Sequence, residues 1–229
     1  GACGAHPATA IRTFSLGELE TLWSKSRGQL RIITLAPEKL SPKELSSLQG
    51  WAKKRKITLS LGHSRATQEQ ASLALKHGFS SITHGWNALQ FHQRSAGVMG
   101  AALGNPNVSI ELILDQIHVA PTVLRWTRLI HGKRLCYVSD CTPAAATPRG
   151  SWHSMGPLRV RVAKGASRVR QGHLAGGGVL LPQAFAAWIQ SEAKRRKLNP
   201  IRLLRQELPS LWDEPLRAIG LSTKKAKLF

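Results

Sequence analysis

Histidine and aspartate side chains stand at the ends of three apolar runs in this sequence. His63 and His84 end two neighbouring runs, and Asp140 ends a third run that lies two runs further on. Neutral imidazoles bind zinc and similar divalent ions, and a nearby carboxylate can accept a proton from water at such an ion. The three positions therefore indicate a hydrolytic metal site.

Three more polar residues stand near the ends of apolar runs, and each has a plainer interpretation. Glu38 is a candidate carboxylate but could equally be structural. Asp115 could hold His118 in place or cap the helix that follows. A single histidine at a strand end is more often a hydrogen-bonded structural residue, so the case for a site depends on His63, His84 and Asp140 together.

The runs that carry these residues recur with the spacing of βα units. Their starts lie about 24 to 28 residues apart, and the segments between them have helical periodicity. This alternation predicts an α/β fold with a parallel sheet, either doubly wound or part of a (β/α)₈ barrel. Only the barrel lets the run ends converge around one axis, so the candidate site favours it. The runs are 30–36, 56–62, 80–85, 108–114 and 134–140.

The pattern changes after residue 140. Residues near 157–171 read as a β-hairpin that turns at 163–166, and a glycine-rich loop follows. Amphipathic periodicity then predicts C-terminal helices over 181–220, broken by Pro209 and Pro215. We therefore expect one domain over 1–229.

Composition is that of a globular protein. The chain has 229 residues, 42% of them hydrophobic, which is enough for one sizeable core. No apolar run reaches the roughly 18 residues that span a bilayer, and the first residues do not resemble a signal peptide. The three cysteines show no CxxC spacing and predict neither a disulfide framework nor a thiolate zinc site. We expect a soluble cytoplasmic protein without membrane contact.

The formal net charge of +21 is the least ordinary feature of the composition. Such a balance attracts polyanions, which makes a basic nucleic-acid-binding protein one alternative. The bases do not interleave with aromatic residues in a known binding motif, so solvated surface is favoured and nucleic acid is an unlikely partner. The basic clusters lie at 53–56, 158–170, 193–197 and 224–227.

Six segments resemble the N-acetylglucosamine-6-phosphate deacetylases of the amidohydrolase superfamily in order and spacing. The stretch GAHPATAIR at 4–12 is similar to a further segment of that family. The resemblance implies a metal-dependent (β/α)₈ barrel, of which this chain covers about strands 4 to 8. The six segments are ITLAPE (33–38), GHSRAT (62–67), THGWNAL (83–89), DQIHVAP (115–121), VSDCTPA (138–144) and GHLAGG (172–177).

The resemblance also implies an activity and a set of catalytic residues. The reaction is hydrolysis of the acetamide of N-acetylglucosamine 6-phosphate to glucosamine 6-phosphate and acetate. His63 and His84 match the metal ligands, and the metal is zinc or another divalent ion such as iron. Asp140 matches the general base, and His118 matches a residue that binds the substrate and polarises its amide.

Substrate contacts follow from the same resemblance. They are residues that hold the phosphate, a histidine that contacts the substrate, and two residues that form the wall over the acetyl group. One phosphate contact reaches across a dimer interface in the family, so a homodimer is implied. Asn87, Ala88 and Arg94 match the phosphate contacts, and Arg94 is the one that crosses the dimer interface. His6 matches the histidine that contacts the substrate. Leu174 and Ala175 match the wall over the acetyl group.

The sequence also departs from the family pattern. The family's metal-binding glutamate lies in a His-Leu-Glu-Gly-Pro motif, which this chain lacks, and the early barrel strands and small β-domain are missing as well. The segment 222–229 shows no strand pattern. We expect a chain truncated at both ends, with little activity by itself. An open partial barrel is also expected to expose an apolar inner face and two edges, and so to aggregate or dimerise.

Three other functions stay open at this point. The chain could be an amidohydrolase that acts on another N-acyl substrate, although the matched phosphate contacts argue against it. It could be an inactive pseudoenzyme, because the metal-binding glutamate is absent. Its charge leaves the nucleic-acid-binding alternative, which a steep salt dependence of binding would favour.

Overall fold

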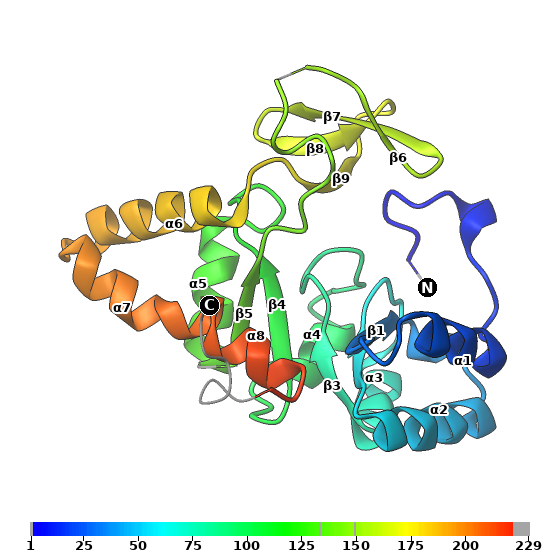
Figure 1. Ribbon diagram of the computed structural model, residues 1–229. Helices are drawn as coiled ribbons and strands as arrows, with labels where there is room; N and C mark the ends of the chain where they lie inside the picture. Colours follow the sequence, from blue (N-terminus) through cyan, green and yellow to red (C-terminus); the bar gives the residue numbers. More distant parts are fainter. Residues whose placement is uncertain (1, 133, 149, 222–229) are drawn as a thin grey trace.

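The protein has an α/β fold built on a parallel sheet. The structure, a computed structural model, describes residues 2–132, 134–148 and 150–221; the basic cluster at 224–227 and the segment 222–229 lie outside them. Five strands pair in parallel in the order β1-β2-β3-β4-β5 (Figure 1). Each strand lies in or at the edge of an expected run, which confirms the parallel α/β prediction. The strands are β1 (Ile32–Leu35), β2 (Thr58–Leu61), β3 (Phe79–Ile82), β4 (Ser109–Ile113) and β5 (Leu135–Val138).

Helices follow the strands as the periodicity predicts. The Ser41 side chain accepts a hydrogen bond from the Glu44 backbone, and the Glu44 carboxylate reaches back to Ser41, so a capping box starts α2. Pro42 occupies the first turn, where its missing N–H costs nothing. The helices of this half are α1 (Leu16–Lys25), α2 (Pro42–Arg55), α3 (Gln68–Lys76), α4 (Gly97–Ala102) and α5 (Pro121–His131), with short 3₁₀ turns at Ala8–Ala10 and Pro37–Lys39.

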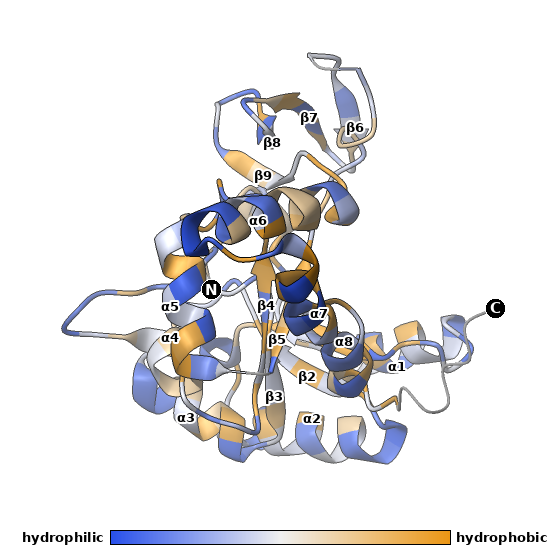
Figure 2. Ribbon diagram, turned by 90° about the vertical axis from the view of Figure 1, so that its left-hand side faces the viewer, coloured by the Kyte–Doolittle hydropathy of each residue, from blue (hydrophilic) through white to orange (hydrophobic). Residues whose placement is uncertain are grey.

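One face of the sheet forms the main core. Leu61, Ile82 and Ile110 are fully buried and occupy neighbouring positions on adjacent strands. They pack with apolar residues of the surrounding helices, such as Leu48 of α2 and Leu124 of α5. Figure 2 shows β4 and β5 in orange at the centre of the molecule. Burial on this face accounts for most of the hydrophobic stabilisation.

The opposite face of the sheet is more polar than expected over its first four strands, although Ile113, Cys136 and Val138 also lie on it. Thr34, Ser60, Ser81 and Ser109 are neighbours across four strands and point away from the main core. The Thr83 hydroxyl lies 2.7 Å from both the Thr34 and the Ser60 hydroxyls. Strand side chains alternate between faces, so the small polar residues that interrupt each apolar run gather on this side.

A second sheet of four antiparallel strands carries the expected hairpin. Its strands are ordered β6-β7-β8-β9, and Figure 1 shows it standing apart from the parallel sheet. The turn between the two middle strands uses Lys164 and Gly165, both with positive φ, as a two-residue hairpin requires. The strands are β6 (His153–Met155), β7 (Leu158–Ala163), β8 (Ala166–Val169) and β9 (Leu174–Gly177).

Three C-terminal helices complete the described chain: α6 (Leu181–Arg196), α7 (Pro200–Leu211) and α8 (Asp213–Ala218). Pro209 lies inside α7, so the expected break at this residue is wrong. Pro209 lacks the N–H that would bond the Arg205 carbonyl, and the helix still continues to Leu211. Pro215 lies in the first turn of α8, a position that tolerates it. Among the described residues, no helix is long and apolar enough to cross a membrane.

A buried carboxylate joins α7 to the parallel sheet and to α5. The Glu207 side chain is 2% exposed, and its oxygens lie 2.7 Å from the Tyr137 hydroxyl and 2.7 Å from Nε of Arg128. Removing one partner of a buried ion pair leaves the other charge uncompensated. We therefore expect Glu207→Ala to lower the free energy of unfolding by about 3 to 5 kcal/mol in urea titrations. The exposed neighbour Gln206 provides the control, and a Gln206→Ala loss of equal size would contradict this explanation.

Candidate active site

Two histidines face each other at the carboxyl end of the parallel sheet. His63 follows β2 and His84 follows β3, both with positive φ, so each side chain leaves the regular strand direction. Their Nε2 atoms lie 3.0 Å apart, and their ring centroids lie 4.8 Å apart at an angle of 80°. The structure therefore brings together the two residues that the sequence nominated as metal ligands.

A backbone carbonyl fixes the orientation of the His63 imidazole. Nδ1 of His63 lies 3.0 Å from the carbonyl oxygen of Ala2, which leaves Nε2 without a proton to donate. The backbone N–H of His84 donates to the Glu111 carboxylate at 3.2 Å. Among the described residues, Nδ1 of His84 is buried and has no hydrogen-bond partner. The His63 ring is thus held at Nδ1, and its Nε2 lies against Nε2 of His84.

Burial keeps these imidazoles neutral. It lowers the pKa of His63, and the neighbouring His84 lowers it further. Burial also lowers the pKa of His84, against the opposing effect of backbone hydrogen bonds. Neutral imidazole is the form that binds a metal ion, so both side chains stay competent as ligands below pH 6.5, the ordinary pKa.

A third histidine, His131, also has a lowered pKa, and it makes the stability of the fold depend on pH. Burial lowers the pKa of His131 on α5, whose Nε2 lies 2.9 Å from the Val108 carbonyl oxygen. The unfolded chain then binds more protons than the folded chain, so stability is full above pH 6.5 and falls as the pH drops below that value. We expect His131→Gln, unfolded in urea with a chelator present, to lose less stability between pH 7.5 and 5.5 than the parent. An equal loss in both proteins would contradict this origin.

Asp140 stands beside the histidines on the loop after β5. Its side chain opens onto the cavity, yet the surrounding protein excludes enough water to raise the pKa of its carboxyl, while His118 and His63 oppose that rise. Gly177 of β9 donates its backbone N–H to the Asp140 carbonyl at 2.8 Å. A Cβ atom on Gly177 would clash with the carbonyl oxygen of Ser139, so only glycine permits this close approach.

His118 and Asp115 form a buried pair at the end of β4. The Asp115 carboxylate lies 2.7 Å from Nδ1 of His118 and accepts the His118 backbone N–H at 2.9 Å. Burial would raise the pKa of Asp115, but these hydrogen bonds lower it overall. Nε2 of His118 is buried without a partner among the described residues, and His118 lines the cavity. The suggestion that Asp115 holds His118 in place is confirmed.

One cavity of about 280 Å³ collects nearly all the nominated residues. Asn87 lines it and also closes the turn after His84, donating from Nδ2 to the His84 carbonyl at 3.3 Å. Arg94 is exposed on a separate loop and does not line the cavity. The nominated residues in the lining are His6, His63, His84, Asn87, Ala88, His118, Asp140, Leu174 and Ala175.

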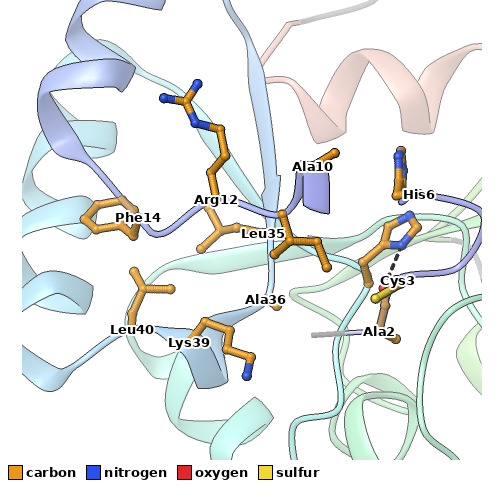
Figure 3. A pocket seen from close by; sticks show the side chains of 12 residues that line it. Ala2, Cys3, His6, Ala10, Arg12, Phe14, Leu35, Ala36, Lys39 and Leu40 are labelled. Atoms are coloured by element: carbon orange, nitrogen blue, oxygen red, sulfur yellow. Dashed lines mark hydrogen bonds between the residues drawn. The ribbon is translucent and has the colours of Figure 1, made fainter. Parts of the chain in front are cut away.

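A second cavity, mostly apolar, lies on the far side of His63. It is formed between the N-terminal segment and the loop after β1, and Figure 3 shows Arg12, Phe14 and Leu35 around it. His6 and His63 line both cavities, and their ring centroids lie 4.9 Å apart. The N-terminal segment therefore forms one wall of the candidate site.

Some residues that shape the site were not identified from the sequence. Glu111 of β4 supports His84 from below, and burial raises the pKa of its carboxyl. A lone acidic residue in the apolar run 108–114 was the available signal. Cys141 and Thr142 also line the cavity and directly follow Asp140 in the chain. Glu38 does not line this cavity; its carboxylate accepts hydrogen bonds from Ser64 at 2.7 Å and the Arg65 backbone at 2.8 Å.

The two histidines fit a divalent metal ion. Two nitrogen ligands about 2 Å from one tetrahedral zinc ion lie about 3.3 Å apart, close to the observed 3.0 Å between the Nε2 atoms. The Ala2 carbonyl at Nδ1 of His63 is the kind of outer contact that metal-binding histidines make. Over the ranges that the structure describes, no group of three or more His, Cys, Asp or Glu side chains could hold a metal ion. Among the described residues, His63 and His84 are therefore the pair of side chains that a metal ion would fit.

The fold and the site define a class: an α/β protein whose titratable side chains converge at the carboxyl end of a parallel sheet, the usual place of catalysis in such folds. No protein-family model matches the chain. It is 34% identical over 179 residues to the N-acetylglucosamine-6-phosphate deacetylase of Vibrio furnissii, which covers 78% of this chain and 44% of the relative. It is 32% identical over 209 residues to the N-acetylgalactosamine-6-phosphate deacetylase of Escherichia coli O157:H7, with 88% and 54% covered.

A solved structure gives the same result. The N-acetyl-D-glucosamine-6-phosphate deacetylase of Mycobacterium smegmatis, a variant in complex with N-acetyl-D-glucosamine-6-phosphate, matches with a TM-score of 0.86 and 27% identity. The match covers 96% of this chain and 56% of that structure. The chain belongs to the N-acetylglucosamine-6-phosphate deacetylase family, and it spans about half the length of the curated relatives it matches.

Proposed function

We propose that this chain carries the metal-binding histidines and the general base of an N-acetylglucosamine-6-phosphate deacetylase. The observation that carries the proposal is the pair of Nε2 atoms of His63 and His84, 3.0 Å apart in a cavity that Asp140 and His118 also line. The parallel sheet is then part of a (β/α)₈ barrel of the amidohydrolase type. The Thr34 and Thr83 hydroxyls meet across the strand between them, which supports a sheet that curls in this way.

In this reaction His63 and His84 hold a divalent metal ion, and zinc suits their nitrogen donors. Held by these two imidazoles, such an ion would supply polarisation of the acetamide carbonyl and a lower pKa for water in the cavity. Asp140 accepts the proton from the attacking water and passes it to the departing amine, so the C–N bond breaks with acetate and a free amine as products. The raised pKa of its carboxyl brings Asp140 closer to the range in which one group can do both.

The other residues position the substrate. His118, held at Nδ1 by Asp115, lines the cavity and contacts the acetamide of the substrate. His6, Leu174 and Ala175 enclose the sugar and its acetyl group. Asn87 and Ala88, on the turn after His84, hold the phosphate.

The exposed position of Arg94 supports a role across a homodimer interface. The Arg94 guanidinium lies outside the cavity of its own chain. Its fork of fixed donors suits a substrate phosphate that is bound in the cavity of the second protomer. The substrate is therefore a phosphorylated sugar.

The test of this function is acetate release with zinc present. N-acetylglucosamine 6-phosphate, N-acetylgalactosamine 6-phosphate and unphosphorylated N-acetylglucosamine are compared as substrates. Because the chain spans about half the length of its relatives, the assay uses both this chain and a version extended at its amino end. The proposal expects the 6-phosphate of N-acetylglucosamine to react fastest. Faster release from the galactosamine compound would assign the activity of the second relative, and equal release from the unphosphorylated sugar would refute the phosphate contacts.

A further inference from the structure

Four arginines gather on one face of the antiparallel sheet. Arg159 and Arg161 lie on β7, Arg168 lies on β8, and Arg170 follows β8 directly. Their neighbours on the strands, such as Val160, point to the opposite face and are buried. Strand alternation therefore places these four residues, the arginine face, on the side away from the small core of this sheet.

The charge of this face is not compensated within the protein. Arg161 and Arg168 are direct cross-strand partners, an arrangement that destabilises a sheet when both charges have the same sign. The sequence contains no aspartate or glutamate between Asp140 and Glu192. Over the residues that the structure describes, no arginine of this face forms an ion pair. A negative partner from outside would relieve this repulsion.

An aromatic ring lies among the arginines. The guanidinium carbon of Arg161 lies 4.9 Å from the centroid of a Trp152 ring, and that of Arg170 lies 5.7 Å from it. Arg159 donates to the Trp152 carbonyl at 3.2 Å. No known binding motif in the sequence interleaves these bases with aromatic residues, but the pairing of β6 with β7 brings Trp152 next to Arg161. Planar guanidinium groups and an indole are the surfaces on which nucleic-acid bases stack.

We propose that the arginine face binds single-stranded nucleic acid. Phosphates meet the guanidinium forks, and unpaired bases stack on the arginine and tryptophan planes. The alternating aliphatic residues of β7, Leu158, Val160 and Val162, point to the other face, so this one lacks the apolar side chains with which a protein inserts into a membrane. Leu174 and Ala175 of the same sheet line the catalytic cavity, whereas none of the four arginines does, so the proposed binding uses a different surface from the deacetylase chemistry.

The test is fluorescence anisotropy of a short labelled oligothymidylate and a short labelled oligouridylate with this chain at several salt concentrations. Arg161→Glu is the informative variant because it converts a repulsive cross-strand pair with Arg168 into an attractive one. It should raise the thermal midpoint while weakening binding at least tenfold. Lys53→Glu on α2 changes the net charge equally at an exposed site and is expected to weaken binding less than twofold.

Salt dependence gives a second readout. With about three to four phosphates neutralised, the logarithm of affinity should fall with the logarithm of salt concentration with a slope near −2 to −3, and Arg161→Glu should make the slope shallower. Equal weakening by both variants would mean that overall charge causes the binding and would overturn the proposal. The proposal would also be overturned if the protein bound neither oligonucleotide but bound vesicles of phosphatidylserine and phosphatidylcholine in a manner that depends on Arg161.

Discussion

Replacement of Asp140 by asparagine is expected to lower acetate release from N-acetylglucosamine 6-phosphate by about 10²- to 10⁴-fold, the usual contribution of a positioned general base. The substitution keeps the size of the side chain and removes its ability to accept a proton. The Asp140 carbonyl still accepts from Gly177, because that bond uses the backbone. Steady-state rates with excess zinc measure the effect, and the loss should appear in kcat rather than in KM.

Asp213→Asn on α8 provides the matched control, because Asp213 does not line the catalytic cavity and should leave the rate within about twofold. Zinc affinity of the Asp140→Asn protein should change far less than its rate if the two histidines hold the metal. A variant with an unchanged rate would show that another group accepts the proton. A variant that lost metal affinity in proportion to rate would make Asp140 a ligand rather than the base.

Removal of either facing histidine is expected to weaken zinc binding by at least about 100-fold, since even loss of an outer contact costs 10- to 100-fold. His63→Ala and His84→Ala each leave one imidazole of the pair whose Nε2 atoms lie 3.0 Å apart. Isothermal titration with zinc measures the change. The double variant should be little weaker than either single variant, because the two side chains act as one site.

His77→Ala serves as the control for this series. His77 ends α3, outside the cavity, where Nδ1 lies 3.1 Å from the side-chain oxygen of Gln49. The zinc affinity of the His77→Ala protein should equal that of the parent protein. Equal weakening by His77→Ala would mean that surface histidines bind the zinc. No weakening by His63→Ala or His84→Ala would mean that their Nε2 atoms share a hydrogen bond and not a metal ion.

The positions of strands and site residues follow from local sequence, and the arrangement of the two sheet faces does not. Short β-rich runs with fixed spacing identify the five parallel strands, and the polar residues after them identify His63, His84 and Asp140. The polar inner face was missed because a run such as 56–62 was read as uniformly apolar, although Ser60 alternates to the other side. Alternation within a short run decides which face a residue occupies.

Contacts between distant segments were beyond the reach of local patterns. The Ala2 carbonyl at His63 joins residues that lie far apart in the sequence and that no spacing rule relates. Trp152 lies beside Arg161 because of the register of the β6–β7 hairpin, and the sequence does not show that register. Glu111 is the one acidic residue of the apolar run 108–114, but the run itself does not show that this carboxylate contacts the His84 backbone. The exposed position of Arg94 agrees with a contact to another chain, which a single sequence shows only through its resemblance to a family.

The most direct measurement is a crystal structure of the zinc-loaded protein with anomalous data collected at the zinc absorption edge. The account predicts one zinc ion about 2 Å from both Nε2 of His63 and Nε2 of His84, with the Asp140 carboxylate facing it from across the cavity. A zinc ion bound elsewhere, or imidazoles that keep their Nε2 atoms in hydrogen-bonding contact with no metal between them, would contradict it.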